Sequence, residues 1–411
     1  MILRRLGKTV LAALVVLFAA AALPDIYWEL FYTPPKEPRA FYSPTVNDFA
    51  IIKGGVDGTL YYTPDEDGFD GDWFEEAVPF LTYRQLVSEG KLPDTLHGVA
   101  MDPKAIRDNN FTFAVKPRYV RKELIPLFPL FESQSGRVRL DMPEDYCRIA
   151  DRVEFVHAAR NEVIEEKSVK FTEALAEAGF AFPGKRTFGN FNTRKPFDAG
   201  VFAVDADDKV FHIIQAKGEP IVADLKIPDD LTPVYIATRE MELREFYGIL
   251  VGEDSRVFMI SYDDYKLIEL PLEGFNWRTD ELSMRGDILF RTVNIIKKDE
   301  VSAFAIDRDY ELIDAYSEPM ETKYDRASGT VAEALFPFQI RFLTANDPYV
   351  GFHARLSGPI ALILMTLSAV VAFFVYRKRG APMKYAAPGI ALAFLTGVFG
   401  LIVVAAIPDF E

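Results

Sequence analysis

The chain has 411 residues, of which 49% are hydrophobic, and its 61 acidic and 46 basic side chains give a formal net charge of −15. Each end carries an excess of two positive charges, so residues 26–355 carry −19, and a field of this sign excludes nucleic acid as an expected partner. A single cysteine, Cys147, excludes an intrachain disulfide, and we expect it to be inert because no histidine lies near it in the sequence.

Residues 1–32 predict an N-terminal membrane anchor or a signal peptide. Three basic residues precede the apolar run of residues 10–23, an order found in both kinds of segment. The alanines at 20–22 fit a signal-peptidase site, whereas the aromatic residues from Tyr27 to Tyr32 resemble an interfacial belt. We favour an uncleaved anchor over cleavage, and both alternatives place the domain that follows outside the cytoplasm.

Residues 33–147 predict the N-terminal part of an ectodomain with mixed β-structure and short helices. Four prolines in residues 33–47 indicate an extended tether. Residues 49–52 and 59–62 flank a glycine-rich segment, which is the pattern of a β-hairpin. Apolar residues at helical spacing over residues 81–89, followed by glycine, predict a short helix.

The stretch between residues 65 and 76 contains seven carboxylates, among them Asp65, Asp67, Asp70 and Asp72. Oxygen ligands suit calcium, but an EF-hand loop needs an acidic or amide residue at its fifth position and glycine at its sixth, where this chain has Phe69 and Asp70. We therefore expect a solvated acidic loop and predict no metal and no cofactor, with these four aspartates as the only candidate ligands if a metal binds.

Residues 148–320 repeat one pattern of a polar turn, an apolar strand with a phenylalanine, a second turn and a further apolar run. The anchoring residues Phe211, Phe258 and Phe304 lie 47 and 46 residues apart, and Phe155 precedes Phe211 by 56. Periods of about 40–50 residues with short strands are typical of β-propeller blades. The predicted fold class is mainly β with a few helices: a partial or complete β-propeller-like ectodomain, with transmembrane helices at both ends of the chain.

A helix is expected to fill the longer first interval of this repeat. Ser168 is its predicted N-cap, Phe171 and Leu175 lie on its apolar face, and Gly179 ends it. The helix is therefore an insertion into the repeat.

The polar, turn-rich residues 189–200 contain candidate contact residues. Arg194, Lys195 and Asp198 are expected to form a charged cluster at a blade mouth, and His212 lies in a predicted blade strand. Such ion pairs and strand histidines are commonly structural. The alternative is contact with a ligand or partner, because loops on a rigid β scaffold often carry binding residues. The sequence has no paired-histidine metal motif, nucleophile elbow or phosphate-binding glycine loop, so no catalytic residue is predicted.

Several short segments of the chain resemble an uncharacterised bacterial family that is catalogued as a domain of unknown function. They are residues 178–183, 189–200, 211–212, 244–248 and 265–271. The resemblance spans roughly residues 40–320 and carries no assigned activity. It implies a membrane-anchored extracytoplasmic domain and an association with ABC-type export systems.

Residues 321–357 predict a connection to the membrane that begins with a helix, and residues 358–407 predict a two-helix transmembrane hairpin. The uncharged runs of residues 358–376 and 386–407 are each long enough to cross a bilayer. The loop between them carries four basic residues, which places it in the cytoplasm and the large domain on the extracytoplasmic side of a bacterial inner membrane. The helix of the connection is expected over residues 330–342.

In the second uncharged run, Gly389, Ala393 and Gly397 recur every four residues and predict a strip of small side chains on one helix face. Such a strip permits close approach of another helix. We favour packing on the neighbouring span of the same chain, and the alternative is packing on a helix of another integral membrane protein.

Two functions fit this sequence. The first is a non-enzymatic accessory or sensor protein that contacts the membrane and other integral membrane proteins as a component of a membrane complex, such as an ABC-type transporter. The alternative is an extracytoplasmic hydrolase or lyase on a propeller scaffold, although a fold alone does not establish an activity. Convergent carboxylates or histidines at the central mouth would favour an enzyme, whereas an apolar or merely charged rim would favour binding.

Overall fold

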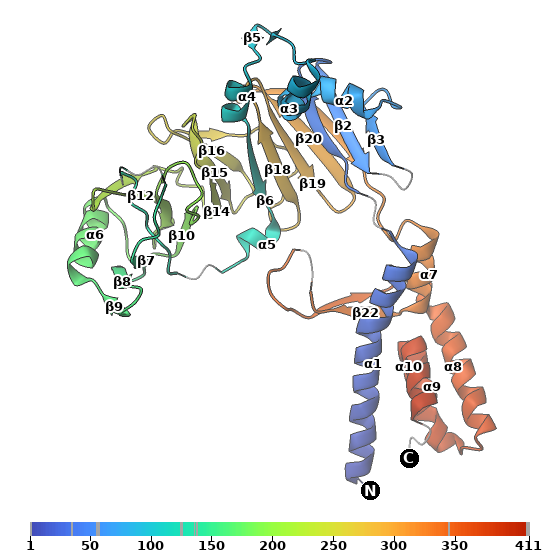
Figure 1. The fold of residues 1–411 in the computed structure, drawn as a ribbon. Helices are drawn as coiled ribbons and strands as arrows, with labels where there is room; N and C mark the ends of the chain where they lie inside the picture. Colours follow the sequence, from blue (N-terminus) through green and yellow to red (C-terminus); the bar gives the residue numbers. More distant parts are fainter. Residues whose placement is uncertain are drawn as a thin grey trace. The chain divides into compact units, whose positions relative to one another are not determined.

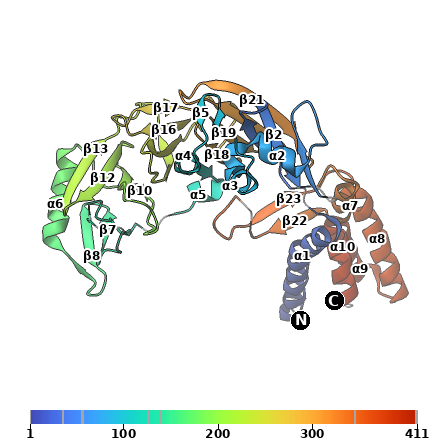
Figure 2. The same cartoon turned by 45° about the horizontal axis from the view of Figure 1, so that its top comes forward.

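The computed structural model describes residues 2–33, 36–54, 58–123, 126–134, 136, 139–343 and 346–407. The chain divides into two compact units. The larger unit is Glu37–Pro319, and the smaller unit combines Met1–Lys36 with Met320–Glu411. The chain is rich in β-structure, with several sheets and ten helices among its described residues (Figures 1 and 2).

The larger unit opens with an antiparallel sheet of β1 (Arg39–Ser43), β2 (Asp48–Gly54) and β3 (Thr59–Tyr62). The predicted hairpin is confirmed by the pairing of β2 with β3, and its turn at residues 55–57 lies outside the described residues. One face of the sheet is covered by α2 (Gly71–Ala77) and α3 (Pro79–Glu89), which bury Phe74 and Val78 against it (Figure 1).

Short elements follow the first sheet. They are β4 (Thr95–Leu96), β5 (Val99–Ala100), α4 (Pro103–Asn109), β6 (Phe111–Val115) and α5 (Pro117–Val120). Among them β6 matters most for the candidate site, because it pairs with a strand about 170 residues later in the chain, with Thr112 opposite Arg285.

Three larger antiparallel sheets form the rest of the unit, each a meander of consecutive strands. The first contains β10 (Arg186–Gly189), β11 (Val201–Val204), β12 (Val210–Ala216) and β13 (Glu219–Asp224). The second contains β14 (Pro233–Thr238), β15 (Phe246–Gly252), β16 (Val257–Ser261) and β17 (Leu267–Glu269). The third contains β18 (Glu281–Gly286), β19 (Arg291–Ile296), β20 (Glu300–Ile306) and β21 (Leu312–Pro319), with β6 paired outside β18.

The repeated phenylalanines occupy equivalent positions in these sheets. Phe211, Phe258 and Phe304 lie on the third strand of each meander and are buried. Each ring enters a core that its sheet shares with the structure before it. Phe211 packs near α6, Phe258 packs with residues of the sheet that begins with β10, and Phe304 packs with residues of the sheet that begins with β14. The repeat in the sequence therefore corresponds to consecutive stacked meanders. The sheets of the described residues do not form a closed barrel or propeller.

The predicted helix insertion is present as α6 (Glu165–Glu177), which packs its Phe171 ring against Phe155 of the small sheet β7 (Asp145–Ile149), β8 (Val153–His157) and β9 (Glu162–Val163). The prediction of Ser168 as N-cap is wrong. The helix begins one turn earlier, at Glu165, and the negative charges of two glutamates in its first turn interact favourably with the positive end of the helix dipole. Ser168 Oγ instead donates to the carbonyl of Ile164.

The smaller unit contains α1 (Ile2–Phe31), α7 (Ala327–Leu335), β22 (Phe338–Arg341), β23 (His353–Leu356), α8 (Ala361–Lys378), α9 (Met383–Thr396) and α10 (Val398–Ala406). Two segments are long and apolar enough to cross a membrane, Leu6–Phe31 in α1 and α8. The helix expected over residues 330–342 ends at Leu335, because Pro337 follows closely and cannot continue it.

The N-terminal helix forms part of the core of this unit. Ala12, Val16 and Ala20 of α1 are buried in one cluster with Phe399 and Val403 of α10. Their spacing of four residues places them on one face of the helix. The alanines at residues 20–22, which carried the alternative of a signal-peptidase site, lie within this continuous helix.

The second C-terminal apolar run is not one helix. Gly397 separates α9 from α10 with a φ of +59°, a conformation that favours glycine. The described structure therefore has a two-part segment, α9 and α10, beside the continuous helix α8 (Figure 1).

The equivalent phenylalanines predict a common energetic role. Truncation of Phe211, Phe258 or Phe304 to alanine should each lower the free energy of unfolding by about 3–5 kcal/mol, because the lost transfer energy and the cavity add. Denaturant unfolding of the purified full-length chain measures this loss. Leu243→Ala, at an exposed leucine, is the matched control and should change it by less than about 0.5 kcal/mol. Losses near the control value at two of the three sites would show that the sheets do not share this anchor.

Candidate functional site

The first strands of the large sheets converge on one cleft. β10 lies beside β14, and β14 lies beside β6. The middle of β6 and the ends of β10 and β14 line an open cleft of 440 Å³, which we call the polar cleft. Its lining residues are Thr112, Phe113, Ala114, Asn190, Asn192, Arg194, Lys195, Pro196, Ala237, Thr238, Arg239 and Glu240.

A buried group of charges forms the wall of this cleft. Lys195 Nζ lies 2.5 Å from Asp198 Oδ1, 2.7 Å from Glu240 Oε1 and 2.7 Å from the carbonyl oxygen of Asn190. Glu240 Oε2 also accepts a hydrogen bond from Asn190 Nδ2 at 2.7 Å. The three charged side chains are at most 3% exposed, so every ionic partner is held out of water.

The cluster has one more carboxylate than it has cations. Burial raises the pKa of Asp198, while the charge of Lys195 opposes that shift and Glu240 adds to it. Lys195 Nζ already contacts two carboxylates and a carbonyl oxygen, and these contacts leave it poorly placed to act as a nucleophile. Lys195 and Asp198 lie in the loop of residues 190–200 between β10 and β11. The cluster can therefore hold this loop in place, but it offers no free base or nucleophile.

His212 holds the other end of the same loop. Its Nε2 atom lies 2.5 Å from the carbonyl oxygen of Ala199, so Nε2 is the donor and carries the proton. Nδ1 then accepts from the hydroxyl of Tyr265 at 2.9 Å. The ring also stacks on Phe202 with centroids 4.4 Å apart. Burial lowers the pKa of His212 to about 4, so the imidazole is neutral at physiological pH.

The loop returns to the sheet at Gly200, where glycine is required. Its φ is +85°, and a Cβ atom would lie 2.4 Å from the carbonyl oxygen of Ile213. Another residue type would force the loop away from His212 and from the backbone of Ile213.

A second cleft, which we call the aromatic cleft, lies on the other side of the loop and has a volume of 270 Å³. Its lining residues are Ser133, Gln134, Phe197, Asp198, Ala199, Ile214, Ala216, Ile221, Arg244, Tyr247 and Tyr262. The guanidinium of Arg244 lies 4.3 Å from the centre of the Phe197 ring. The rings of Tyr247 and Tyr262 stack with centroids 3.7 Å apart, and burial raises the pKa of both hydroxyls. The loop thus separates a polar surface from an aromatic one.

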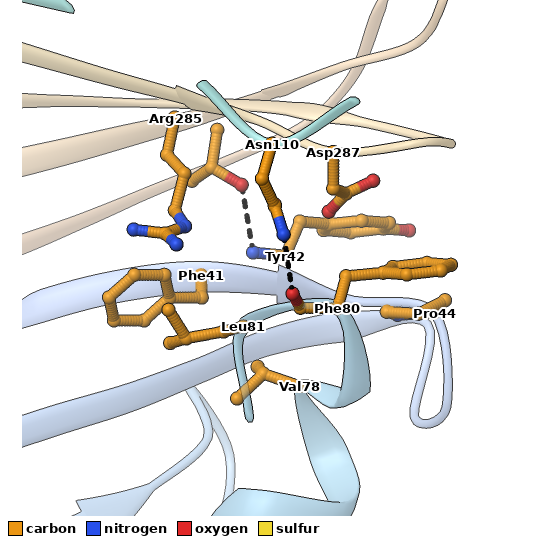
Figure 3. A pocket seen from close by; sticks show the side chains of 10 residues that line it. Phe41, Tyr42, Pro44, Val78, Phe80, Leu81, Asn110, Arg285 and Asp287 are labelled. Carbon is orange, nitrogen blue, oxygen red and sulfur yellow. Dashed lines mark hydrogen bonds between the residues drawn. The ribbon is translucent and has the colours of Figure 1, made fainter. Parts of the chain in front are cut away.

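A much smaller cavity lies between the sheet of β1–β3 and the sheet that contains β18 (Figure 3). Figure 3 shows Arg285 and Asp287 on the side of β18 and Phe41 on the side of β1. Asn110 Nδ2 donates to the carbonyl of Phe80, while its Oδ1 is buried with no hydrogen-bond partner among the described residues. The volume of 20 Å³ suits one water molecule and is too small for a ligand.

The structure brings the four predicted contact residues together around one loop but gives them different roles. Lys195 and His212 are structural anchors of the loop, and Asp198 joins them while lining the aromatic cleft. Arg194 alone is exposed, and it lines the polar cleft. The sequence reasoning missed Glu240, Arg239 and the tyrosines, although Arg244 and Tyr247 lie in a segment that carried the family resemblance.

The remaining predicted residues lie elsewhere. Asp70 is the N-cap of α2 and accepts from the amide of Trp73 at 2.8 Å, and the described residues contain no group of three or more His, Cys, Asp or Glu that could hold a metal ion. In the smaller unit a Cβ atom on Gly389 would lie 2.2 Å from the hydroxyl of Tyr376 in α8, and Ala393 is buried in the same cluster. Gly397 is the break after α9.

The chain belongs to the family described as a domain of unknown function, DUF4857, which matches residues 39–306, well over half of its length. The matched range contains β6, β10 and β14 and the residues that line both clefts. No curated protein matches the chain.

The buried cluster predicts a pH-dependent effect of Lys195→Met. The variant leaves two buried carboxylates unpaired and should lose about 3–5 kcal/mol of the free energy of unfolding at neutral pH. The pKa of Asp198 is already raised in the folded state and should rise further, so protonation favours the folded variant. The loss should therefore be smallest near pH 5 and grow as the pH rises, as measured by denaturant unfolding across that range.

Two further variants make this comparison specific. Lys195→Met with Glu240→Gln removes one carboxylate and should recover part of the lost stability. Lys226→Met, at an exposed lysine, should change the free energy of unfolding by less than about 0.5 kcal/mol. A loss that does not vary with pH would contradict the unpaired-carboxylate explanation.

The geometry of His212 predicts that its ring stays neutral down to about pH 5. Because its folded pKa of about 4 is below the unfolded value, its contribution to stability is present above about pH 6.5 and is lost as the pH falls toward 4. Nitrogen NMR of histidine-labelled protein should show an Nε2-protonated ring that does not titrate above pH 5, with His212→Gln identifying the resonance. A midpoint near 6.5 for that resonance would refute the buried, neutral assignment.

Proposed function

We propose that the chain is a non-enzymatic accessory or sensor protein, anchored in the bacterial inner membrane, whose larger unit lies on the extracytoplasmic side and binds a ligand or partner. The proposal includes membership of a membrane complex, such as an ABC-type transport complex. The single observation that carries the binding role is the polar cleft, whose wall is built from ion pairs that are already satisfied.

The charge of the cleft supports binding over catalysis. A central mouth with free carboxylates or histidines would have favoured a hydrolase or lyase. Here Asp198 and Glu240 are both occupied by Lys195, and both ring nitrogens of His212 have partners. General base catalysis needs a group that can take a proton from a substrate, whereas these groups hold one another. The exposed charges at the rim are arginines, which suit binding.

The stacked meanders support the interpretation of the sheets as propeller-like blades. The inner strands β10, β14 and β6 lie next to one another at the polar cleft. In propellers the inner strands surround the central channel, whose mouth commonly binds ligands. We infer that the three sheets are consecutive blades of a partial propeller.

The packing of α1 supports permanent anchoring. Its buried face contributes Ala12, Val16 and Ala20 to the core of the smaller unit, and Trp28 is buried near its end. Removal of a signal peptide would expose the partner side chains on α10. We therefore infer that the N-terminal helix is retained as a span, and the basic residues between α8 and α9 support a cytoplasmic position for that loop.

One labelling experiment tests both the topology and the complex. Cys147 is buried and burial raises the pKa of its thiol, so the natural chain should not react with a membrane-impermeant maleimide dye. Asp229→Cys places an exposed thiol in the larger unit, and Met383→Cys places one in the basic loop. In intact spheroplasts only Asp229→Cys should react, and Met383→Cys should react after the membrane is opened.

The labelled Asp229→Cys chain then reports the assembly. After extraction in mild detergent, native electrophoresis should place the dye in a species that contains other integral membrane proteins. A dye signal only at the size of the single chain would exclude a stable complex, and labelling of Met383→Cys in intact spheroplasts would reverse the topology. Unmodified chain is the control for dye that binds without reaction.

A further inference from the structure

Two arginines in the polar cleft have no acidic partner among the described residues. Arg194 is exposed and its side chain makes no hydrogen bond or salt bridge to the rest of the described chain. Arg239 is also exposed and donates from Nη1 to the carbonyl oxygen of Thr112 at 2.9 Å and to its hydroxyl at 3.0 Å. That contact orients the guanidinium without neutralising it, since both acceptors are uncharged.

The carboxylate nearest to these arginines in the lining is already occupied. Glu240 Oε1 accepts from Lys195, and Oε2 accepts from Asn190. Arg194 and Arg239 therefore give the cleft a local positive charge, although residues 26–355 together carry a net charge of −19. A cation pair without counter-charge is costly unless water or an anion compensates it.

A third arginine feels this charge. Arg285 lies opposite Thr112 in the pairing of β18 with β6. Burial lowers the pKa of its guanidinium, Asp287 opposes the shift, and the charge of Arg239 adds to it. Arg239 and Arg285 are thus close enough for their charges to repel each other.

The rest of the lining supplies uncharged polar groups. Asn192, Thr112 and Thr238 face the cleft beside the arginines. The volume of 440 Å³ lies within the range of about 300–1,000 Å³ that is usual for sites of small ligands. Guanidinium groups bind the oxygens of phosphoryl and sulfuryl groups through paired hydrogen bonds, and amide and hydroxyl donors complete such sites.

We propose that the polar cleft is a binding site for a tetrahedral oxyanion, the phosphoryl group of a small ligand, held by Arg194 and Arg239 with Asn192 and Thr238 as further donors. The inference rests on the proposed role as a binding protein and specifies the class of its ligand. Anion binding can be measured on the isolated chain, so its result does not depend on whether a membrane complex is found.

The test is calorimetric titration of the purified full-length chain in detergent with inorganic phosphate at constant ionic strength. The natural chain should bind phosphate saturably, and Arg194→Gln with Arg239→Gln should weaken that binding by about tenfold or more, because charge-assisted hydrogen bonds are lost. The matched control is Arg107→Gln with Arg160→Gln, two exposed arginines outside the cleft, which should leave the affinity unchanged.

Three results with phosphate would overturn the proposal. The first is the absence of saturable heat from phosphate beyond that of an equal ionic strength of chloride. The second is an equal loss of affinity in the cleft variant and the control variant, which would assign the effect to net charge. The third is a cleft variant that binds like the natural chain, with thermal unfolding of all three proteins without phosphate as the check that the variants are folded.

Two further ligands separate the possible sources of the phosphoryl group. Glycerol 3-phosphate represents a soluble ligand, and dihexanoyl phosphatidic acid represents a lipid headgroup with short acyl chains. Equal affinities that both depend on Arg194 and Arg239 would support a soluble phosphoryl ligand. A higher affinity for the lipid that is lost in the cleft variant would support a headgroup. Binding of acetate as tightly as phosphate would overturn the assignment to a tetrahedral anion.

Discussion

The buried contact of Lys195 with Asp198 and Glu240 is the constraint on which the candidate site depends. Lys195 and Asp198 belong to the loop between β10 and β11, whereas Glu240 follows β14 in the next sheet. The ion pairs therefore join two sheets and also join two positions within one loop. Their desolvation is costly, so the cluster persists only because each oxygen and ammonium proton has a close partner. His212 and Gly200 then fix the end of the loop that Lys195 does not reach.

This arrangement also decides the sign of the charge that the cleft presents. The acidic side chains at the wall are paired with Lys195, and the exposed arginines have no acidic partner in the part of the chain that the structure describes. A local positive surface thus exists inside a strongly acidic unit. Net charge governs the approach of partners at long range, but the Debye length of about 8 Å limits that influence at physiological salt. Inside the cleft the charges of the lining decide, and the exposed ones are Arg194 and Arg239.

The sequence predicted the features that depend on local pattern. The spacing of Phe211, Phe258 and Phe304 revealed the repeated meanders, because the pattern of strands and turns depends on residues that are neighbours in the sequence. It could not reveal the second carboxylate partner of Lys195, because Glu240 lies 45 residues away and only the stacking of two sheets brings them together. The same limit applies to β6, which joins the third sheet from an earlier part of the chain. Ser168 shows a different failure, since a serine that suits an N-cap also suits a side-chain bond to the preceding turn.

The packing of the smaller unit bears on the role of a segment whose composition fits two alternatives. A basic start and a short apolar core describe both a signal peptide and an anchor. A signal peptide needs only hydrophobicity, whereas a retained helix in a bundle needs small side chains on the face that meets its neighbour. In α1 the alanines at 12 and 20 are buried against α10, while Leu14 and Phe18 are exposed. This division into a packed face and an apolar outer face is what a lipid-exposed helix in a bundle requires, and it supports a chain that is held in the membrane from both ends.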